Sequence, residues 1–500
     1  MAAAASSTNR PGALEITRRL AEICGPPFAR FAGPADEVAG RTARWVAVPG
    51  GPHAAAEVLR LAAAHQLTVV PRGAGTKIDW GAAPAQVDIM LDTGRLAGIW
   101  HEPQGSPVAE IGAGTPLRAV QATLDRTGQR LPIDVPSPGA TLGGVLAADE
   151  AGPLRHRHGS PCAQLVGVRY LDADGELVSL GAAGTARLGQ AGPAGGEPAG
   201  GGAAGGGAAG GGAAGGGAAG GGAAAVFGAA QVPGLDVARL LCGSQGGLGV
   251  LVSATMRVQA VPASRVWVTR PVWTPLEVHD LVRAVLAARL DPAAVELDLP
   301  VPVPLPRRRV HPDHPSVLGR PDHPSIARRS AGPAAAGSLV ALLEGGPADV
   351  AERVERLVGL LGPEAVVGHA APEWWGRYPF GPGETALRIE VPINDLHAAV
   401  YALRDAAGSA VPVRGSAGIG TVHAALPGSL PPDRVASIVA AVRGVLLARR
   451  GRCVVVAAPA PVRRVVDLWG DLPTLPRLRA AKEHLDPHQR LAPGRLPGGL

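Results

Sequence analysis

The sequence predicts an α+β protein with more than one domain, and three observations support this. Short runs of apolar and β-branched residues alternate with segments of helical periodicity along the 500 residues. The pattern changes near Pro262, after which strands and helices alternate more loosely, as in a sheet covered by helices. The chain is also long enough to bury two or three separate cores.

The first ordered elements begin after residue 40. WVAVPG, starting at Trp45, indicates a short strand, and residues 52–66 indicate a helix that carries Pro52 in its first turn. The apolar run TVVP is a buried strand that leads directly into RGAGT. These elements predict a strand–helix–strand unit that ends in a glycine-rich loop.

A second unit follows the first. VAEIGAG is a strand, and Thr115 is expected to be the N-cap of a helix whose first residue is Pro116. Residues 165–180 predict a hairpin that turns at Asp174-Gly175. Further on, DVARLLCGS predicts a helix and GVLVSATMRVQAVP a strand.

Beyond Pro262 the elements alternate to the end of the chain. WVTRPVW, SLVALLEG, ALRIEVP and GIGTVHAAL predict strands. EVHDLVRAVLAA, ADVAERVERLVGLL, LHAAVYALRDAA and PDRVASIVAAVRGVLLARR predict helices. This order predicts a second domain.

Two segments predict no packed structure. Residues 1–40 are rich in Ala, Ser, Pro and Gly with one short helical pattern, so we expect a flexible leader. Residues 192–225 are nearly all Gly and Ala, and a stretch so rich in glycine loses much entropy on ordering while burying little area. We expect a disordered insertion in a surface loop, because closure entropy grows only logarithmically with loop length.

A Pro- and His-rich stretch, residues 307–325, interrupts the second half of the chain. Its histidines, His311, His314 and His323, are close enough in sequence to suggest a metal site. The prolines, and the absence of a helix to fix the ligand geometry, favour a disordered loop instead. We therefore predict no metal.

Composition excludes several classes of function. The net charge of +6 is spread along the chain without dense basic runs, so nucleic-acid binding is not expected. The four cysteines are far apart in sequence and form no CxxC pair, which excludes an iron–sulfur site in this chain and indicates reduced thiols. No signal peptide and no run of about 18 apolar residues is present. We expect a cytoplasmic protein that contacts a membrane only through partners.

The strongest local motif is PRGAGTK, residues 71–77, directly after a strand. Gly73 and Gly75 allow backbone N–H groups to converge on pyrophosphate oxygens, and Arg72, Thr76 and Lys77 add donors. The motif is neither GxGxxG nor a Walker loop, which argues against Rossmann and P-loop sites. A tight turn after a strand is the alternative reading of this loop.

Two more glycine-rich loops strengthen the ligand interpretation. PGATLGG, residues 138–144, precedes a short helix, and GSQGGLG, residues 243–249, precedes a strand. Three such loops on separate strands can line an extended cleft for a long dinucleotide.

The motifs PRGAGTK-DWG, LDTGRL, GAGTPL, GATLGGVLAA, AGPLRHRHGS, GLDVARLLCGSQGGLGV and LDPHQRLAPGR occur in one order. In that order the chain resembles the FAD-binding subunit of bacterial glycolate oxidase, in the vanillyl-alcohol-oxidase-type superfamily. The resemblance covers residues 41–262 well and the remainder thinly. It implies a two-lobed PCMH-type FAD-binding domain over 41–262, an α+β cap domain with an antiparallel sheet over 263–460, and a segment, 461–500, that returns to the FAD domain.

The resemblance also implies a cofactor and its contacts. FAD would be bound non-covalently, because no residue is an obvious attachment point for the flavin. The residues placed at the cofactor are Arg72, Gly73, Ala74, Gly75, Thr76, Lys77, Gly139, Ala140, Thr141, Gly143, Gly144, Gly152, Arg157, Gly249, Val250 and Leu251.

The chain departs from the family near the reacting end of the flavin. Ala230, Gln231 and Leu235 stand where the family has Lys, Asn and Tyr, and Cys162 stands in place of a family arginine. The nucleotide loops keep their glycines while polar groups near the flavin are lost. This pattern fits a subunit that holds FAD without oxidising substrate by itself.

The catalytic residues remain unassigned. Oxidation of a hydroxy acid needs a cation for the carboxylate and a base near the α-carbon. Arg388, in ALRIEVP, is the best candidate for the cation, and a solvated strand arginine is the alternative. His423 and His158 are possible bases, and hydrogen-bonded core or loop histidines are the alternative.

Three functions remain open. The chain is an FAD-binding subunit that takes part in oxidising a small 2-hydroxy acid, together with a second flavoprotein subunit and a separate iron–sulfur subunit. Alternatively, it is a self-sufficient FAD-dependent oxidase or dehydrogenase of another alcohol or hydroxy acid, or a non-catalytic flavoprotein scaffold.

Overall fold

The structure is a computed structural model that describes residues 12–101, 105–182, 224–227, 236–301 and 336–500. Most of its strands belong to three sheets, which we call the small, middle and large sheets. Helices cover the small and large sheets, so the predicted α+β class is confirmed. The residues predicted as a disordered insertion lie outside the description up to residue 223, and so do 307–325 and the departures at 230, 231 and 235.

The small sheet has the order β1-β4-β6-β5. Its strands are β1 (Ala29–Phe31), β4 (Trp45–Ala47), β5 (Val69–Arg72) and β6 (Ile89–Asp92). β6 pairs in parallel with both β4 and β5, and the helix α2 (Pro52–Ala64) is the crossover that makes β4 and β5 run in the same direction. Strand β5 leads directly into the first glycine-rich loop.

The prediction of a flexible leader is wrong for residues 12–40. Helix α1 (Ala13–Cys24) buries Ile16, Leu20 and Cys24 in the core that contains Trp45, and two short strands, β2 (Glu37–Val38) and β3 (Arg41–Thr42), follow β1. Trp45 also donates its indole hydrogen bond to Thr17 at 3.0 Å. The apolar stripe of this single helix outweighs the loop-like composition around it.

The middle sheet is antiparallel and has the order β12-β11-β10-β13-β8-β7. Its strands are β7 (Ile99–His101), β8 (Val108–Gly112), β10 (Leu165–Leu171), β11 (Leu177–Ala182), β12 (Ala224–Phe227) and β13 (Val250–Arg257). Its helices are α3 (Leu117–Asp125), α4 (Leu142–Ala148), α5 (Arg155–His158) and α6 (Val237–Leu241), and a two-stranded ribbon joins β9 (Gln129–Arg130) to β14 (Gln259–Ala260).

Two local predictions meet different outcomes in this sheet. The hairpin β10–β11 is confirmed, with Leu171 opposite Leu177 across the turn. The predicted N-cap at Thr115 is wrong, because α3 begins at Leu117 and its N-cap is Pro116. The Thr115 hydroxyl instead donates to the Gly112 carbonyl at 2.7 Å, which holds the tight connection between β8 and α3.

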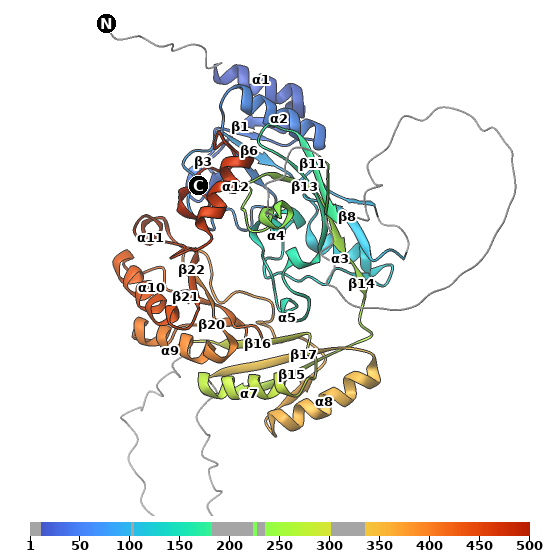
Figure 1. Cartoon of the computed structure of the whole chain (residues 1–500), viewed down its shortest axis with the longest axis vertical. Helices are drawn as coiled ribbons and strands as arrows, with labels where there is room; N and C mark the ends of the chain where they lie inside the picture. Colours follow the sequence, from blue (N-terminus) through green and yellow to red (C-terminus); the bar gives the residue numbers. More distant parts are fainter. Residues whose placement is uncertain (1–11, 102–104, 183–223, 228–235, 302–335) are drawn as a thin grey trace, which may run out of the picture.

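The large sheet is antiparallel, as expected for the cap domain, with the order β18-β15-β17-β16-β20-β21-β19-β22. Its strands are β15 (Ser264–Val272), β16 (Ala294–Leu299), β17 (Gly337–Gly345), β18 (Val366–Gly368), β19 (Thr385–Glu390), β20 (Val413–Ser416), β21 (Thr421–Leu426) and β22 (Arg452–Ala457). Four helices cover its outer face in Figure 1: α7 (Pro275–Ala287), α8 (Pro347–Leu361), α9 (Leu396–Ala407) and α10 (Pro432–Leu447). The inner face turns toward α5.

The end of the chain returns to the first sheets. After α11 (Ala460–Val465) comes helix α12 (Leu475–Leu485), whose Leu485 side chain packs in the core of the middle sheet. Leu491 forms a parallel bridge with Val69 of β5. The buried ammonium of Lys482 donates to the carbonyls of Gly247 and Leu491, each at 2.7 Å, and to Asp486 at 2.6 Å. The C-terminal segment therefore supports both β5 and the third glycine-rich loop.

The described part of the chain contains neither a helix suited to cross a membrane nor a cluster of metal-ligating side chains. No helix there has the length and apolar character needed to cross a membrane. No group of three or more His, Cys, Asp or Glu side chains there could hold a metal ion.

Candidate functional site

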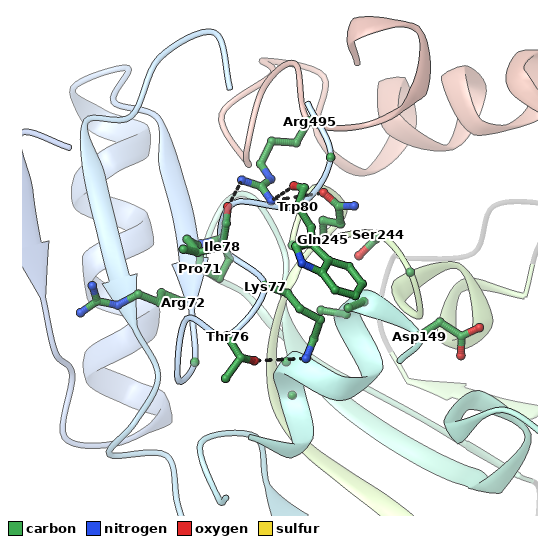
Figure 2. Close-up of a pocket in the computed structure, with 18 of the residues that line it drawn as sticks. Pro71, Arg72, Thr76, Lys77, Ile78, Trp80, Asp149, Ser244, Gln245 and Arg495 are labelled. Carbon is green, nitrogen blue, oxygen red and sulfur yellow. Dashed lines mark hydrogen bonds between the residues drawn. The ribbon is translucent and has the colours of Figure 1, made fainter. Parts of the chain in front are cut away.

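The three glycine-rich loops meet at one cavity of about 290 Å³, which we call the large cavity to distinguish it from a neighbouring cavity of about 50 Å³. It lies where the small and middle sheets face β19 and β22 of the large sheet, and Figure 2 shows its labelled residues. The predicted residues that line it are Arg72, Gly73, Ala74, Gly75, Thr76, Lys77, Thr141, Gly143, Gly144, Gly249, Leu251 and Arg388.

The structure does not bring every predicted residue to this cavity. Ala140 and Val250 have buried side chains that belong to the two cores of the N-terminal half, and Gly139 lies outside the lining. Gly152 lines a second cavity, and Arg157 forms an ion pair with Asp291 instead. These five residues therefore lie around the large cavity without lining it.

The cations of the first loop are already paired. The guanidinium of Arg72 lies 2.7 Å from Asp92 and 3.3 Å from Asp36, and Figure 2 shows it pointing away from Lys77 and Trp80. Lys77 donates to Glu150, and burial lowers the pKa of its ammonium. The expected role of Arg72 and Lys77 as free donors to phosphate is therefore not supported. The backbone N–H groups of the loop remain as donors, and Gly75 has a φ of +73°, which favours glycine.

Arg495 is a cation of the cavity that the sequence reasoning missed. It is 3% exposed and donates to the carbonyls of Ile78 at 2.9 Å and Trp80 at 2.8 Å, and to the Gln245 side chain at 3.3 Å. These partners are all neutral, and its Nε has no hydrogen-bond partner among the described residues. Burial lowers the pKa of Arg495 to about 10, so it stays charged at neutral pH. Arg495 ends the motif LDPHQRLAPGR, so the sequence held a signal for it.

The donors of the large cavity fit a diphosphate. Glycine backbone approaches the cavity from three loops, and one buried guanidinium adds a positive charge that no carboxylate side chain hydrogen-bonds. Convergent N–H groups together with an arginine are a common way to hold phosphate oxygens. The residues present therefore fit the pyrophosphate of a dinucleotide.

Two cysteines far apart in the sequence meet beside this cavity. The thiols of Cys162 and Cys242 lie beside each other, and Cys242 lines the large cavity. This contact lowers the pKa of Cys162 and raises that of Cys242 far above its usual range. Sequence spacing gave no indication of the pair.

A second cavity of about 50 Å³, which we call the small cavity, lies between residues 151–155 and the large sheet. His423 lines it, and burial together with the charges of Arg388 and Arg155 lowers the pKa of His423 to about 3. Arg388 on β19 stands directly opposite His423 on β21. The two predicted substrate residues are thus neighbours at adjoining cavities. His158 lines neither of the two cavities.

Residues 43–181, which include the first two glycine-rich loops, match the FAD_binding_4 family, an FAD binding domain. This part of the chain is an FAD-binding domain, and FAD is its cofactor. The chain is also similar to the solved structure of a 4-ethylphenol oxidase from Gulosibacter chungangensis, with a TM-score of 0.62 over 97% of both chains at 13% identity. An alkyldihydroxyacetonephosphate synthase gives a TM-score of 0.61 over 96% of this chain and 85% of that one, at 12% identity. The predicted PCMH-type fold is confirmed.

Curated relatives are similar over shorter stretches. A D-2-hydroxyglutarate dehydrogenase of Xanthomonas citri is 29% identical over 28% of this chain and 31% of its own length. A D-lactate dehydrogenase of Archaeoglobus fulgidus is 28% identical over 33% of this chain and 37% of its own. The glycolate oxidase subunit GlcE of Escherichia coli is 28% identical over 32% of this chain and 33% of its own. The matches thus span about a third of the length of these relatives.

Proposed function

We propose that this chain is an FAD-dependent oxidoreductase subunit that takes part in the oxidation of a small 2-hydroxy acid, as a glycolate-oxidase-like protein would. The observation that carries the proposal is the junction of the two cavities, where Arg388 lines the large cavity and His423 lines the small cavity beside it. The names of three relatives point to the same substrate class, since 2-hydroxyglutarate, lactate and glycolate are all 2-hydroxy acids.

FAD, when bound, supplies a two-electron acceptor for a hydride from the α-carbon. The chain's own residues would hold and orient the reactants. Loop backbone and Arg495 would bind the diphosphate, and Arg388 would add positive charge beside the substrate carboxylate. His423 is neutral above about pH 3, so its imidazole can accept a hydrogen bond at physiological pH.

We propose non-covalent binding of FAD. Cys242 is a nucleophile in the wall of the large cavity, but its strongly raised pKa keeps the thiol protonated and unreactive. Acid precipitation of the purified protein should release the yellow colour into the supernatant. Flavin retained in the pellet would contradict this proposal.

We also propose partners. The four cysteines are free, and only Cys162 and Cys242 are in contact, so the described residues offer no set of ligands for a cluster. Electrons would pass to a separate iron–sulfur subunit beside a second flavoprotein subunit, which agrees with the similarity to a glycolate oxidase subunit. We propose that the chain consists of an FAD-binding domain over 41–262, a cap domain over 263–460 and a C-terminal segment, 461–500, that returns to the FAD-binding domain.

The test compares the chain alone with the complex. Anaerobic addition of glycolate or lactate to the isolated holoprotein should bleach the flavin slowly or not at all, and co-expression with the two partner subunits should restore turnover with an artificial acceptor. Rapid bleaching in the isolated chain would favour the self-sufficient oxidase or dehydrogenase. Purified protein that takes up no FAD would favour a non-catalytic scaffold.

A further inference from the structure

The small cavity presents an unusual set of polar groups. Its lining includes Tyr378, Glu296 and Arg155, which come from the connection before β19, from β16 and from α5. None of these three was recognised as a site residue in the sequence. Together they define what kind of ligand the cavity can take.

Tyr378 can only accept a hydrogen bond from a ligand. Its hydroxyl donates to Glu150 at 3.1 Å, and Glu150, which is 3% exposed, is also held by Ser137 at 2.6 Å and by Lys77. Glu150 is a carboxylate that accepts hydrogen bonds from all three donors, so the Tyr378 hydroxyl uses its proton in the bond to Glu150. Only the oxygen lone pairs of Tyr378 are then left for a ligand. Burial and Glu150 also raise the pKa of Tyr378 well above its usual value, so the phenol stays neutral.

The ring of Tyr378 is fixed in place. It stacks on Phe380 with a centroid distance of 4.7 Å and an interplanar angle of 19°, and it meets the His423 ring edge-on at 4.9 Å. Such aromatic packing, together with the bond to Glu150, prevents the ring from turning its hydroxyl elsewhere. The free lone pair of Tyr378 is therefore preorganised.

Glu296 supplies the complementary donor. Its side chain is buried at 5% exposure, and its Oε1 has no hydrogen-bond partner among the described residues. Burial, together with the nearby Asp134, raises the pKa of Glu296 to about 8. At neutral pH this carboxyl group is a neutral acid that can donate one hydrogen bond.

Arg155 supplies the charge. Three arginines line the cavity, Arg155, Arg377 and Arg414. Arg414 lies 2.8 Å from Asp298, whereas Arg155 and Arg377 form no ion pair within the described ranges. Arg377 is exposed and Arg155 is half-buried, so Arg155 is the less hydrated of the two unpaired guanidinium groups and the one that gains more from an anionic ligand.

We propose that the small cavity binds the 2-hydroxy acid, with the Tyr378 oxygen accepting a hydrogen bond from the substrate hydroxyl and with Arg155 and Glu296 binding its carboxylate. Glu150 acts as a positioning residue that fixes the Tyr378 hydroxyl. A water molecule needs roughly 10–15 Å³ of such space, so the cavity of about 50 Å³ holds about three to five water-sized groups. That size favours glycolate, the smallest 2-hydroxy acid, and excludes a large side chain. This inference rests on the proposed function.

The test measures binding without turnover. Holoprotein whose flavin has been reduced photochemically under anaerobic conditions cannot accept a hydride, so it can be titrated with glycolate and with acetate, which lacks the hydroxyl. Trp374 lines the cavity, so tryptophan fluorescence can follow the titration. We expect glycolate to bind about 3- to 10-fold more tightly than acetate, as one net hydrogen bond predicts.

Two variants assign the contacts. Tyr378→Phe keeps the stacked ring and should bring the glycolate-to-acetate ratio of Kd values close to one, while the Kd for acetate stays within about twofold. Arg155→Gln should weaken both ligands by about tenfold or more, as loss of a charge-assisted bond predicts. Tyr401→Phe, at an exposed tyrosine on α9, is the matched control and should change neither value.

The outcomes separate this inference from the proposed function. Equal affinity of wild-type protein for the two acids, or an unchanged ratio in Tyr378→Phe, would overturn the inference even if glycolate bleaches the oxidised flavin. Binding with the expected ratio in a protein whose complex never oxidises glycolate would refute the proposed function and leave the binding site intact.

Discussion

Gly73 of the first glycine-rich loop packs directly against Thr141 of the second, so closely that a β-carbon at position 73 would lie 2.2 Å from the Thr141 Oγ1 atom. Thr141 is the N-cap of α4, and its hydroxyl oxygen accepts a hydrogen bond from the backbone N–H of Gly144 at 3.3 Å. The contact therefore links the loop after β5 to the start of α4. The absence of a side chain at Gly73 thus allows two loops that line the large cavity to pack against each other.

We expect Gly73→Ala to lower FAD affinity by at least about tenfold, because the methyl group must displace Thr141 and the loop with it. The ratio of flavin absorbance to protein absorbance after gel filtration measures this. Gly444→Ala, on the helix α10 where a β-carbon meets nothing within 4 Å, is the control. A yellow Gly73→Ala protein with full flavin content would show that the loops do not need this contact.

Arg495→Gln should weaken FAD binding by about 10- to 100-fold, the effect of losing a charge-assisted hydrogen bond to phosphate. The guanidinium bridges the loop at Ile78 and Trp80 to Gln245, so part of the loss would come from loosened loops. Titration of the apoprotein with FAD, followed by flavin fluorescence, gives the Kd. Arg479→Gln, at an exposed position of α12, should leave the Kd unchanged, and an equal effect of both variants would refute a local role for Arg495.

Glu296→Gln should stabilise the protein increasingly as pH rises from 5 to 9. Folding raises the pKa of Glu296 from 4.5 to about 8, so the native state binds one more proton than the unfolded state between these values. The stability that this proton provides is fully present below pH 4.5 and is lost as pH rises toward 8. The difference in free energy of unfolding between variant and wild type should be near zero at pH 5 and at least about 1 kcal/mol at pH 9. A constant difference across this range would show that Glu296 titrates normally.

Cys162 should be the first of the four cysteines to react with iodoacetamide at pH 7.5. The neighbouring Cys242 thiol lowers the pKa of Cys162, whereas burial raises the pKa of Cys24 to about 11 and that of Cys453 to about 12. Peptide mapping by mass spectrometry at short reaction times would identify the modified residue.

Cys162→Ser should then make Cys242 more reactive, because the Cys162 thiol is the main cause of its raised pKa. Cys24→Ser is the control and should leave both reactivities unchanged. If iodoacetamide modified Cys453 before Cys162 in the wild-type protein, Cys162 would not be the most reactive thiol.

The sequence predicted those parts of the fold and site that depend on local chemistry. PRGAGTK after a β-strand identified the first loop, and the φ of +73° at Gly75 is the local requirement for glycine there, whereas Gly73 is required by the side chain of Thr141 in the second loop. The α+β alternation and the antiparallel cap sheet were also correct. The prediction from composition was wrong for residues 12–40, because only three residues of α1 form its buried face: Ile16, Leu20 and Cys24.

The contacts that the sequence did not reveal join residues distant in the chain. Tyr378 and Glu150 are 228 positions apart, and Arg495 and Gln245 are 250 apart. The carboxylate partners of Arg72 and Lys77 likewise belong to other elements, so the cations of the first loop looked free in the sequence. Such pairings depend on how the sheets pack, which periodicity and motif spacing do not specify.

The return of the C-terminal segment to the first sheets has a consequence for biosynthesis. Domains generally fold as units, with the N-terminal one first, while the ribosome is still adding residues. Here β5 and the loop after α6 lack their supports until Lys482, Leu491 and Arg495 have emerged, after the whole large sheet has been made. FAD can therefore be captured in full only after residues 482–495 have been translated, so a ribosome stalled within the large sheet would carry a nascent chain with an unfinished cofactor site.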